Sequence, residues 1–537
     1  MPGMIVAPQP QAVEEGAKVL ARGGNAFDAA LACAWVQFLV DPHSCGVGGY
    51  LLLTFRNGQV GQPSPILDAP ALAGGKVRPE MWETAMIRPN PGGWGFFLKD
   101  KVNEDGYLSI CTPGAIRGLE TIHNRWCSRP WDELIQPAIE LAEKGWQVSS
   151  YMAGRWKDKP QYYESTSLLE KLQVTSEARR IYLKSDGYPY DAGDYLCNPD
   201  YGQTLLRLAQ HGPQDFYEGA LARDMMIDLE THSSWVTADD LSKYAVRDIP
   251  PIVVTYRDYL IQTASAPHGG PTLAAILNIL EGYDLTQLGH NSPAYIYLVS
   301  MAMKAAFADR NRYLGDPRFV EVPYTWMISK DRAKEWRGII DSGGDINPSR
   351  AQTGPTDTTQ VTVVDQWGNC VSLTHSLGSS SGVITPGLGF MYNNSMCNFH
   401  PISGHPNSIL AGKGRTTGMT PTIVWKEKKP ILILGAPGAT RIITSVLSVI
   451  LNHLDFGMSI SDAVLAPRFD CQGDTINCQA RIPEGICVEV RKKHQIVRLP
   501  QSHGGLGLVH AIDIDTDTGQ LRGAADAGAE GMALLVE

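Results

Sequence analysis

The sequence predicts a large folded protein in which helices and strands alternate. Hydrophobic residues make up 43% of the 537 residues and charged residues 19%, which supplies a packed core and excludes a disordered or collagen-like chain. Helical and strand-like patterns alternate over roughly the first 330 residues, and a β-hairpin pattern follows at residues 359–376. These observations favour a mixed helix-and-sheet fold, and the length alone allows one large body or roughly three to four average domains.

The first predicted elements are two helices and a strand. Apolar and small residues recur at helical spacing over residues 12–20 and stop at Gly23, which is typical of a helix C-terminus. Asn25 can cap a second helix over residues 26–40. Because small and apolar residues cover all sides of this second helix, we expect it to be buried. A strand is predicted at residues 50–55.

Amphipathic helices are predicted at residues 130–144 and 292–313. The character then changes at residues 342–355, which are rich in Gly, Pro, Ser and Asp, have no apolar period and predict an exposed linker. The linker is followed by two short apolar runs on either side of a turn at residues 365–369. On pattern alone, this region is a linker followed by a hairpin.

Net charge and hydropathy argue against two classes of partner. The chain has 46 Lys and Arg against 56 Asp and Glu, a formal charge of −10, so nucleic acid is not expected as a partner. The longest apolar run, residues 29–40, is too short to span a membrane, which takes about 20 residues. The N-terminus lacks a basic segment followed by an apolar one, so no signal peptide is predicted and a cytoplasmic location is expected.

The ten cysteines are scattered along the chain without a Cys-x-x-Cys pair. This spacing predicts neither a zinc site nor a disulfide framework, and buried small apolar side chains are the expected role. No metal and no organic cofactor are predicted.

The junction between the linker and the hairpin offers a nucleophile. If the peptide bond before Thr358 is cut, the freed α-amine of Thr358 can act as general base for its own hydroxyl. Thr374 and Ser376 stand on the returning arm of the hairpin and could orient that hydroxyl. Residues 435–441, a Gly-rich turn after an apolar strand, could supply paired N–H groups for an oxyanion.

A second candidate nucleophile is Ser380, because residues 378–382 fit the Gly-x-Ser-x-Gly pattern of α/β-hydrolases. That motif needs a helix directly after it, and the following residues 383–389 contain Pro and Gly and make a poor helix. We therefore expect this serine-rich segment to border the active site rather than to supply the nucleophile.

Eleven short stretches, in register along nearly the whole chain, resemble the γ-glutamyltransferase family of N-terminal nucleophile hydrolases. They are GGNAFDAA at 23–30, GVGG at 46–49, TPGAIRG at 112–118, PHGG at 267–270, ILNILE at 276–281, ADRNRYLGDP at 308–317, DTTQVTVVD at 357–365, GN at 368–369, YNN at 392–394, MTPT at 419–422 and PGATRI at 437–442.

The resemblance implies an α+β fold, a four-layer αββα sandwich, and self-cleavage between Asp357 and Thr358. A large chain, residues 1–357, and a small chain, residues 358–537, would then form one intertwined domain as a heterodimer, with a dimer of heterodimers left open. The resemblance assigns Thr358 as nucleophile, Thr374 and Ser376 as orienting hydroxyls, and Gly438 and Ala439 as oxyanion donors.

The sequence departs from the family at the positions that would bind a glutamyl group. The Arg that grips its carboxylate is matched by Ile66, and the two serines that assist are matched by Thr417 and Gly418. The Asp and Gln that hold its ammonium are matched by Asn398 and Ser395. Each lost charge-assisted contact removes about 1.5–3 kcal/mol, so ordinary glutamyl recognition is not expected.

We therefore predict an amidohydrolase that cleaves a small-molecule amide, or a related acyl bond, through an acyl-Thr358 intermediate, by hydrolysis rather than transfer. Arg415, close to the altered serine pair, could bind a carboxylated acyl group, with an ordinary surface arginine as the alternative. Two other functions remain open: a γ-glutamyl transferase or hydrolase acting on glutathione-like compounds, and an unprocessed binding protein of the same fold.

Overall fold

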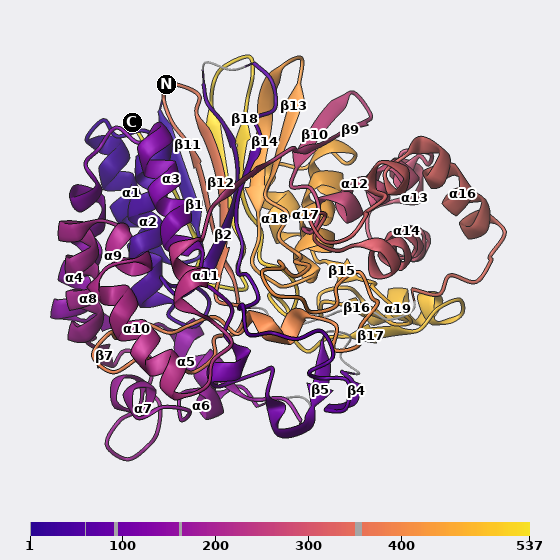
Figure 1. Cartoon of the computed structure of the whole chain (residues 1–537). Coiled ribbons are helices and arrows are strands. Elements are labelled where there is room, and N and C mark those ends of the chain that lie inside the picture. Colours follow the sequence, from indigo (N-terminus) through magenta and orange to yellow (C-terminus); the bar gives the residue numbers. More distant parts are fainter. Residues whose placement is uncertain (1, 59–60, 91–94, 160–163, 349–356) are drawn as a thin grey trace.

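Two large β-sheets lie face to face in a computed structural model, and helices cover both outer faces (Figure 1). The structure describes residues 2–58, 61–90, 95–159, 164–348 and 357–537. The first sheet has the strand order β20 (Met532–Val536), β1 (Gly3–Ala7), β11 (Thr359–Val364), β12 (Cys370–Ser376), β2 (Tyr50–Arg56), β3 (Ile66–Ala69) and β8 (Arg247–Ile249). The second has the order β19 (Leu521–Ala525), β18 (His510–Ile514), β14 (Lys429–Gly435), β13 (Thr422–Lys426), β10 (Tyr259–Thr263) and β9 (Ile252–Tyr256).

Each sheet carries its own helical layer. The first is covered by α1 (Pro10–Ala21), α2 (Ala26–Val40), α3 (Ala115–Trp126), α4 (Trp131–Lys144) and α8 (Pro199–His211). The second is covered by α12 (Gly270–Leu280), α14 (Pro293–Tyr313), α16 (Lys330–Asp341), α17 (Arg441–Leu454) and α18 (Ile460–Leu465). The predicted four-layer αββα sandwich is confirmed.

Shorter elements complete the described chain. They are β4 (Met86–Pro89), β5 (Phe96–Leu98), β6 (Trp146–Gln147), α5 (Ser150–Lys157), α6 (Leu168–Lys171), α7 (Ser176–Tyr182), β7 (Tyr195–Leu196), α9 (Gln214–Tyr217), α10 (Ala220–Thr231), α11 (Ala238–Ser242), α13 (Leu285–Leu288), α15 (Tyr324–Met327), β15 (Phe469–Asp470), β16 (Ile476–Cys478), α19 (Glu484–Arg491), β17 (Ile496–Arg498), and 3-10 turns at Lys99–Lys101, Tyr107–Ser109 and Ser395–Asn398.

The predicted first helices and strand are present. α2 begins with a capping box, in which the Asn25 side chain accepts from the backbone N–H groups of Phe27 and Asp28. All but one of its residues are buried, because the helix lies between the first sheet and α4, with α1 beside it on the same sheet. A helix that is apolar all round is stable only in such a position.

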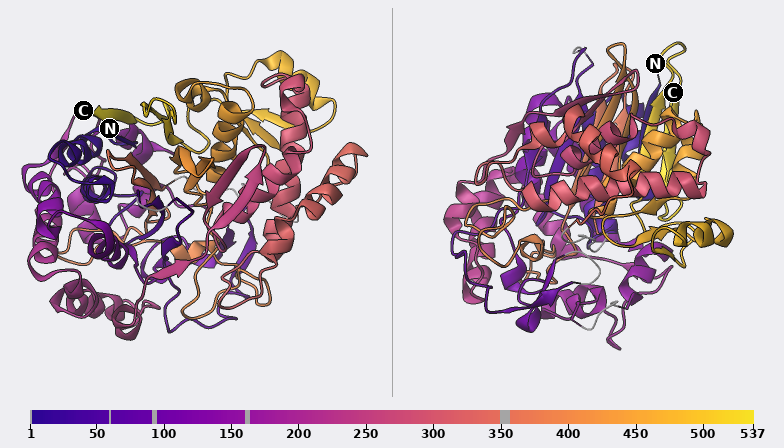
Figure 2. Two further views of the ribbon diagram at one scale, coloured as in Figure 1. Left: turned by 90° about the horizontal axis from the view of Figure 1, so that it is seen from above. Right: turned by 90° about the vertical axis from the view of Figure 1, so that its right-hand side faces the viewer.

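The predicted hairpin forms the centre of the first sheet. β11 pairs antiparallel with β12, and Thr359 lies opposite His375. β1 and β2 flank this hairpin, so strands from before and after position 357 lie side by side in one sheet. Figure 2 shows the same interleaving from above, with the C-terminal β20 beside β1. The division into chains 1–357 and 358–537 stays a prediction, and much of the predicted linker lies outside the described residues.

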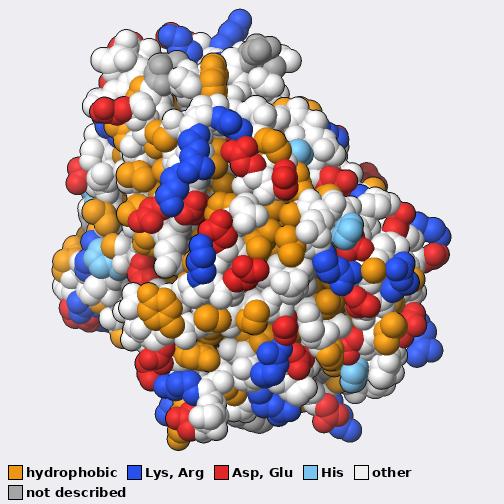
Figure 3. Space-filling model, turned by 90° about the vertical axis from the view of Figure 1, so that its left-hand side faces the viewer, with side chains coloured by type: hydrophobic (Ala, Val, Ile, Leu, Met, Phe, Trp, Pro, Cys, Tyr) orange, Lys and Arg blue, Asp and Glu red, His pale blue; other side chains and the backbone are white. Residues whose placement is uncertain are grey.

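The structure also places the charged side chains and the cysteines. Among the described residues, no helix is long and apolar enough to cross a membrane. On the face that Figure 3 shows, acidic and basic side chains are interspersed rather than gathered by sign. All ten cysteines are free, and eight of them are buried.

Candidate active site

Thr358 lies directly before β11, and its hydroxyl faces the peptide bond that is predicted to break. Thr358 Oγ1 lies 2.8 Å from the carbonyl oxygen of Asp357 and 3.0 Å from Ser376 Oγ. Both Asp357 and Thr358 are buried, with exposed fractions of 4% and 9%. The sheet holds the hydroxyl in place, because β11 pairs on both sides within it.

Ser376 connects the returning strand to the same carbonyl. Its hydroxyl donates to the Asp357 carbonyl oxygen at 2.9 Å and accepts from the backbone N–H of Gly378 at 2.8 Å. Because an N–H group can only donate, Ser376 Oγ accepts from Gly378, and its own proton is available for the Asp357 carbonyl oxygen. A hydrogen bond to a carbonyl oxygen that will carry negative charge favours attack on its carbon.

Thr374, the other predicted orienting hydroxyl, does not reach the nucleophile. Its Oγ1 donates to Gln360 Oε1 at 2.6 Å. The Gln360 amide is held in turn by Ser372 Oγ at 3.0 Å. Thr374 therefore contacts a side chain of the neighbouring strand instead of Thr358, and the structure differs from the expectation at this residue.

Gly438 and Ala439 present two unused backbone donors ahead of α17. Within the described part of the chain, neither N–H has a hydrogen-bond acceptor, although Gly438 is buried and Ala439 half-buried. Both residues have positive φ, 139° and 52°, which is unusual for alanine. Unpaired N–H groups in a strained turn are suited to bind an oxyanion.

A small pocket opens beside Thr358. Its lining residues are Tyr50, Asp357, Thr358, Gly378, Asn398, Arg415, Thr416, Thr417, Gly418, Met419, Ala439, Thr440 and Ile442. The cavity volume is about 30 Å³, which holds no more than a few water molecules. Asp357 is part of the lining, so the pocket would become larger if Asp357 moved away after cleavage of the Asp357–Thr358 bond.

Arg415 lies inside this pocket and not on the surface. It is 6% exposed, its Nη2 donates to the Tyr50 hydroxyl, and its guanidinium lies 4.7 Å from the centre of the Tyr50 ring. No carboxylate of the described residues lies within ion-pair distance of it. When the Asn398 side-chain amide is turned so that its oxygen faces Arg415, that oxygen accepts from Arg415 Nη1 at 2.9 Å.

Thr417 and Gly418 form part of the pocket wall. The Thr417 hydroxyl contacts His268 Nδ1 at 2.9 Å, and His268 Nε2 lies 3.3 Å from the buried Asp68 carboxylate. Gly418 has no room for a side chain, because a Cβ atom there would lie 1.9 Å from the carbonyl oxygen of Ala439. Glycine at 418 therefore allows the wall to pack against the turn that carries the unpaired donors.

Two residues predicted to line the acyl pocket lie elsewhere. Ile66 is fully buried in β3, within an apolar cluster that includes Met396. Ser395 is also fully buried and does not line the pocket. Both positions were inferred from the family resemblance. In the structure, their packing places them in the core beside the pocket.

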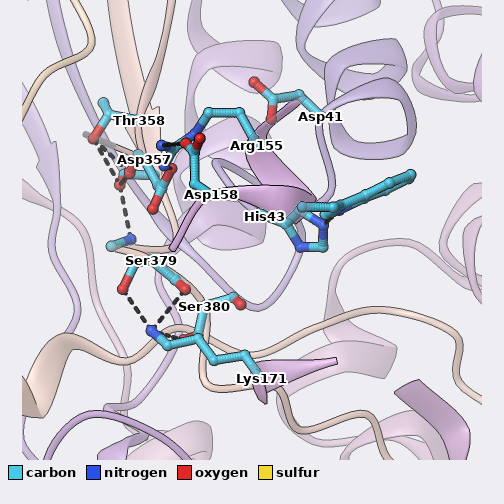
Figure 4. Close-up of polar contacts among 12 residues, drawn as sticks. Asp41, His43, Arg155, Asp158, Lys171, Asp357, Thr358, Ser379 and Ser380 are labelled. Atoms are coloured by element: carbon cyan, nitrogen blue, oxygen red, sulfur yellow. Dashed lines mark hydrogen bonds and ion pairs between the residues drawn. The ribbon is translucent and has the colours of Figure 1, made fainter. Parts of the chain in front are cut away.

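The serine-rich segment borders the site, as expected. Ser380 has a φ of 54° and a buried hydroxyl, and no helix follows it, so the α/β-hydrolase arrangement is absent from this described segment. Lys171 holds the segment from below: its ammonium donates to Ser379 Oγ at 2.6 Å and to the Ser380 carbonyl at 3.0 Å (Figure 4).

Two charged residues near the junction were not singled out from the sequence. Arg155 on α5 pairs with the Asp357 carboxylate (Figure 4). Asp41 lies just beyond the end of α2, and burial raises the pKa of its carboxyl to about 7, with a further upward contribution from the charge of Asp357. Hydrogen bonds from Ser44 and Gln9 and the positive charge of Arg155 oppose this rise. Neither residue belongs to a sequence motif.

The described residues contain no cluster of His, Cys, Asp and Glu that could hold a metal ion. The groups that line the pocket include hydroxyls, backbone N–H groups and the guanidinium of Arg415. They can supply a nucleophile, oxyanion donors and a positive charge for a substrate.

Comparison with known proteins relates this arrangement to a family. Residues 12–536 match the model of the gamma-glutamyltranspeptidase family. The chain belongs to that family. It is 34% identical to the acylase ACY 1 proenzyme of Pseudomonas sp. strain V22, over 99% of this chain and 93% of the relative. It is 31% identical to the glutathione hydrolase proenzyme of Bacillus subtilis strain 168, over 99% of this chain and 91% of the relative.

Solved structures support the γ-glutamyltranspeptidase fold. Cephalosporin acylase from Bacillus halodurans superposes with a TM-score of 0.87, at 24% identity, over 99% of this chain and 95% of that chain. The gamma-glutamyltranspeptidase of Helicobacter pylori matches 62% of this chain and 90% of its own, at 32% identity and a TM-score of 0.56. This γ-glutamyltranspeptidase-family protein is therefore an amide hydrolase or acyltransferase with the N-terminal nucleophile hydrolase fold, and its relatives support self-processing from a proenzyme.

Proposed function

We propose that this protein cuts itself between Asp357 and Thr358 and then hydrolyses a small-molecule amide, or a related acyl bond, through an ester on Thr358. The observation that carries the proposal is the contact of two hydroxyls with one carbonyl: Thr358 Oγ1 and Ser376 Oγ lie 2.8 and 2.9 Å from the Asp357 carbonyl oxygen. A peptide carbonyl held against a hydroxyl and a second donor has the parts needed for attack.

After self-cleavage, the α-amine of Thr358 takes the proton of Oγ1 as the oxygen attacks the substrate carbonyl carbon. The N–H groups of Gly438 and Ala439 stabilise the negative oxygen of the tetrahedral intermediate. The amine returns the proton to the leaving nitrogen, and water then hydrolyses the acyl ester by the same steps. Every group required comes from the chain itself.

The acyl group proposed for this pocket carries a carboxylate. Arg415 is buried without a carboxylate partner among the described residues, and burying an unpaired charge is costly unless a ligand neutralises it. The residues that would bind the ammonium and carboxylate of a glutamyl group are replaced by Asn398 and Thr417. The similarity to an acylase proenzyme supports an acyl group other than glutamyl.

A second candidate is hydrolysis or transfer of γ-glutamyl groups from glutathione-like compounds, favoured by the 31% identity to the Bacillus subtilis glutathione hydrolase proenzyme. An unprocessed binding protein is the third reading, and it requires that the chain stay intact. In the first two cases, the large and small chains form a heterodimer, and we keep a cytoplasmic location as a proposal from the sequence.

The first test is intact mass and N-terminal sequencing of the purified protein beside Thr358→Ala. We expect two fragments, the smaller starting at Thr358, and one uncut chain in the variant. Turnover of anilides with a carboxylated, a neutral and a γ-glutamyl acyl group then tests the substrate. Preference for the carboxylated acyl anilide supports the proposal, efficient γ-glutamyl turnover favours the second candidate, and a chain that stays uncut favours the binding protein.

A further inference from the structure

The residue before the predicted cleavage site is held by a helix far away in the sequence. Arg155 Nη2 contacts Asp357 Oδ1, and the two residues are 202 positions apart. In Figure 4, the Arg155 side chain reaches from its helix to the Asp357 carboxylate, on the side of the junction away from Ser379. Of the described Lys, Arg and His residues, only Arg155 lies within 4.0 Å of this carboxylate.

The helix that presents Arg155 is anchored on both ends. Ser149 caps its N-terminus by accepting from the backbone N–H of Met152 at 3.1 Å. The neighbouring Trp156 is 1% exposed, and its indole N–H donates to His43 Nε2. Burial lowers the pKa of His43 to about 3, so this imidazole is neutral and can accept. With Trp156 fixed in the core, Arg155 next to it is directed toward the junction.

The pair is buried on the Asp357 side and open on the other. The Asp357 side chain is 4% exposed and that of Arg155 is 23% exposed. Arg155 also donates to Asp158 at 2.9 Å, whose side chain is 60% exposed. Asp158 is therefore an outer partner with water available, whereas Asp357 depends on Arg155. Without Arg155, the buried Asp357 carboxylate would remain unpaired close to Asp41. If the Asp357 side chain then turned toward water, the backbone carbonyl of Asp357 would move with it.

We propose that Arg155 is a positioning residue for self-cleavage: it fixes the Asp357 side chain so that the adjoining carbonyl stays against Thr358 Oγ1 and Ser376 Oγ. This inference rests on the proposed self-cleavage and names a residue that positions the bond to be cut. Arg155 takes no part in the bond changes. Its contribution is the geometry of the scissile peptide, for which displacements of about 1 Å can cost two orders of magnitude in rate.

The chemistry that Arg155 positions is balanced within the chain. Thr358 Oγ1 forms a bond to the Asp357 carbonyl carbon, and the bond from that carbon to the Thr358 nitrogen breaks. The hydroxyl proton passes to the nitrogen, which becomes the free amine. One water then hydrolyses the resulting ester, leaving a new α-carboxylate on Asp357 and restoring the Thr358 hydroxyl. The Asp357 residue then carries two carboxylates beside Asp41, which favours its release from the pocket.

The test follows self-cleavage of the full-length chain after a pulse of cell-free synthesis, by denaturing gel and intact mass. Arg155→Ala and Asp357→Asn should each slow cleavage by on the order of tenfold to a hundredfold, the range for loss of a charge-assisted contact. Arg155→Lys should recover part of the rate. The double variant Arg155→Ala with Asp357→Asn should be no slower than either single variant, because both act through one contact. Asp158→Ala is the matched control and should stay within about twofold.

Thermal unfolding of each variant made uncleavable by Thr358→Ala separates positioning from misfolding. Equal cleavage rates in wild type and Arg155→Ala, or additive losses in the double variant, would overturn the inference. A wild-type chain that never cleaves would instead remove the proposed function, so the two failures are distinguishable. If Arg155→Ala does not fold, the self-cleavage rate of Asp357→Asn alone tests the inference, because that variant leaves α5 unchanged.

Discussion

The two ends of the pocket are built from different kinds of groups. At the nucleophile end, the donors are the hydroxyls of Thr358 and Ser376 and the backbone N–H groups of Gly438 and Ala439. At the proposed acyl end, the pocket is lined by the side chain of Arg415. The first set lies on a β-hairpin and a helix start, and the second on a chain segment without regular structure before β13.

This difference accounts for the pattern that the resemblance predicts, in which the catalytic residues are retained and the glutamyl-binding residues are not. A backbone N–H is donated by any residue with the right φ and ψ, so alanine at 439 can stand where the family has glycine. A side-chain contact disappears with a single substitution. The acyl end can therefore change its ligand while the catalytic end keeps its geometry.

The largest effect is expected at the catalytic end. Ser376→Ala removes the hydroxyl that donates to the Asp357 carbonyl at 2.9 Å. Self-cleavage should slow by about two to three orders of magnitude, as for loss of an oxyanion donor. The rate is measured by the cell-free pulse described above. Ser376→Thr, which keeps the hydroxyl, is the control, and an unchanged rate in Ser376→Ala would remove Ser376 from the mechanism.

The buried carboxyl of Asp41, which interacts electrostatically with Asp357, predicts a pH dependence of stability. Burial raises the pKa of Asp41 to about 7, above its value in the unfolded chain. The folded state therefore binds the proton more tightly, so this contribution to stability is present below about pH 4 and is lost as pH rises through 7. Thermal unfolding of the uncut Thr358→Ala protein should show stability falling by a few kcal/mol over this range.

Asp41→Asn in the same Thr358→Ala background is the comparison for that pH profile. The amide cannot ionise, so the fall assigned to Asp41 should be absent. Parallel profiles for the two proteins would contradict the assignment. The charged neighbours that also act on Asp41 are Asp357 and Arg155, and both are the same in the two proteins.

At the acyl end, Arg415→Met should reduce kcat/KM for a carboxylated acyl anilide by about 10- to 150-fold, equivalent to about 1.5–3 kcal/mol. Turnover of a neutral acyl anilide should change much less, because the lost contact is to the carboxylate. Steady-state kinetics on the two anilides measure this ratio. Equal losses on both substrates would show that Arg415 supports the pocket without selecting the acyl group.

The smallest effect is expected for Ala439→Gly, which tests whether the proposed oxyanion donor at position 439 depends on the backbone alone. Ala439 has a φ of 52°, and glycine adopts this conformation without the cost of about 1 kcal/mol that alanine carries. Ala439→Gly should raise the free energy of unfolding by up to about that amount and leave turnover within a few-fold. Chemical denaturation and kinetics measure both. A large loss of turnover would show that the alanine methyl shapes the pocket.

Local patterns were sufficient to predict much of the fold. The Asn25 cap, the all-apolar α2 and the hairpin of β11 and β12 were predicted because each depends on residues close together in the chain. The position of Thr358 at the head of a strand followed from the same hairpin. The stacking of two sheets was known only through the family resemblance, because nothing local records which sheet faces which.

The residues of the acyl end illustrate where such reasoning stops. The sequence left Arg415 either as a substrate contact or as an ordinary surface arginine. Its burial beside Tyr50 excludes the surface position. Ile66, assigned to the pocket by alignment, lies in the core. Thr374 was expected to orient the Thr358 nucleophile, yet its hydroxyl donates to Gln360 Oε1. For Arg415 and Ile66 the outcome depended on neighbours from distant segments, whereas Thr374 is held by its partner on the adjacent strand of the same hairpin.

The sequence by itself predicted the first two helices, the central hairpin and the placement of Thr358 between a linker and a strand, and the family resemblance added the expected loss of the glutamyl-binding side chains. Only the tertiary structure decided that Arg155 meets Asp357 across 202 positions and that Arg415 is buried without a described carboxylate partner. The reason is physical: periodicity and capping act within a few residues, whereas ion pairs and burial depend on how the layers pack.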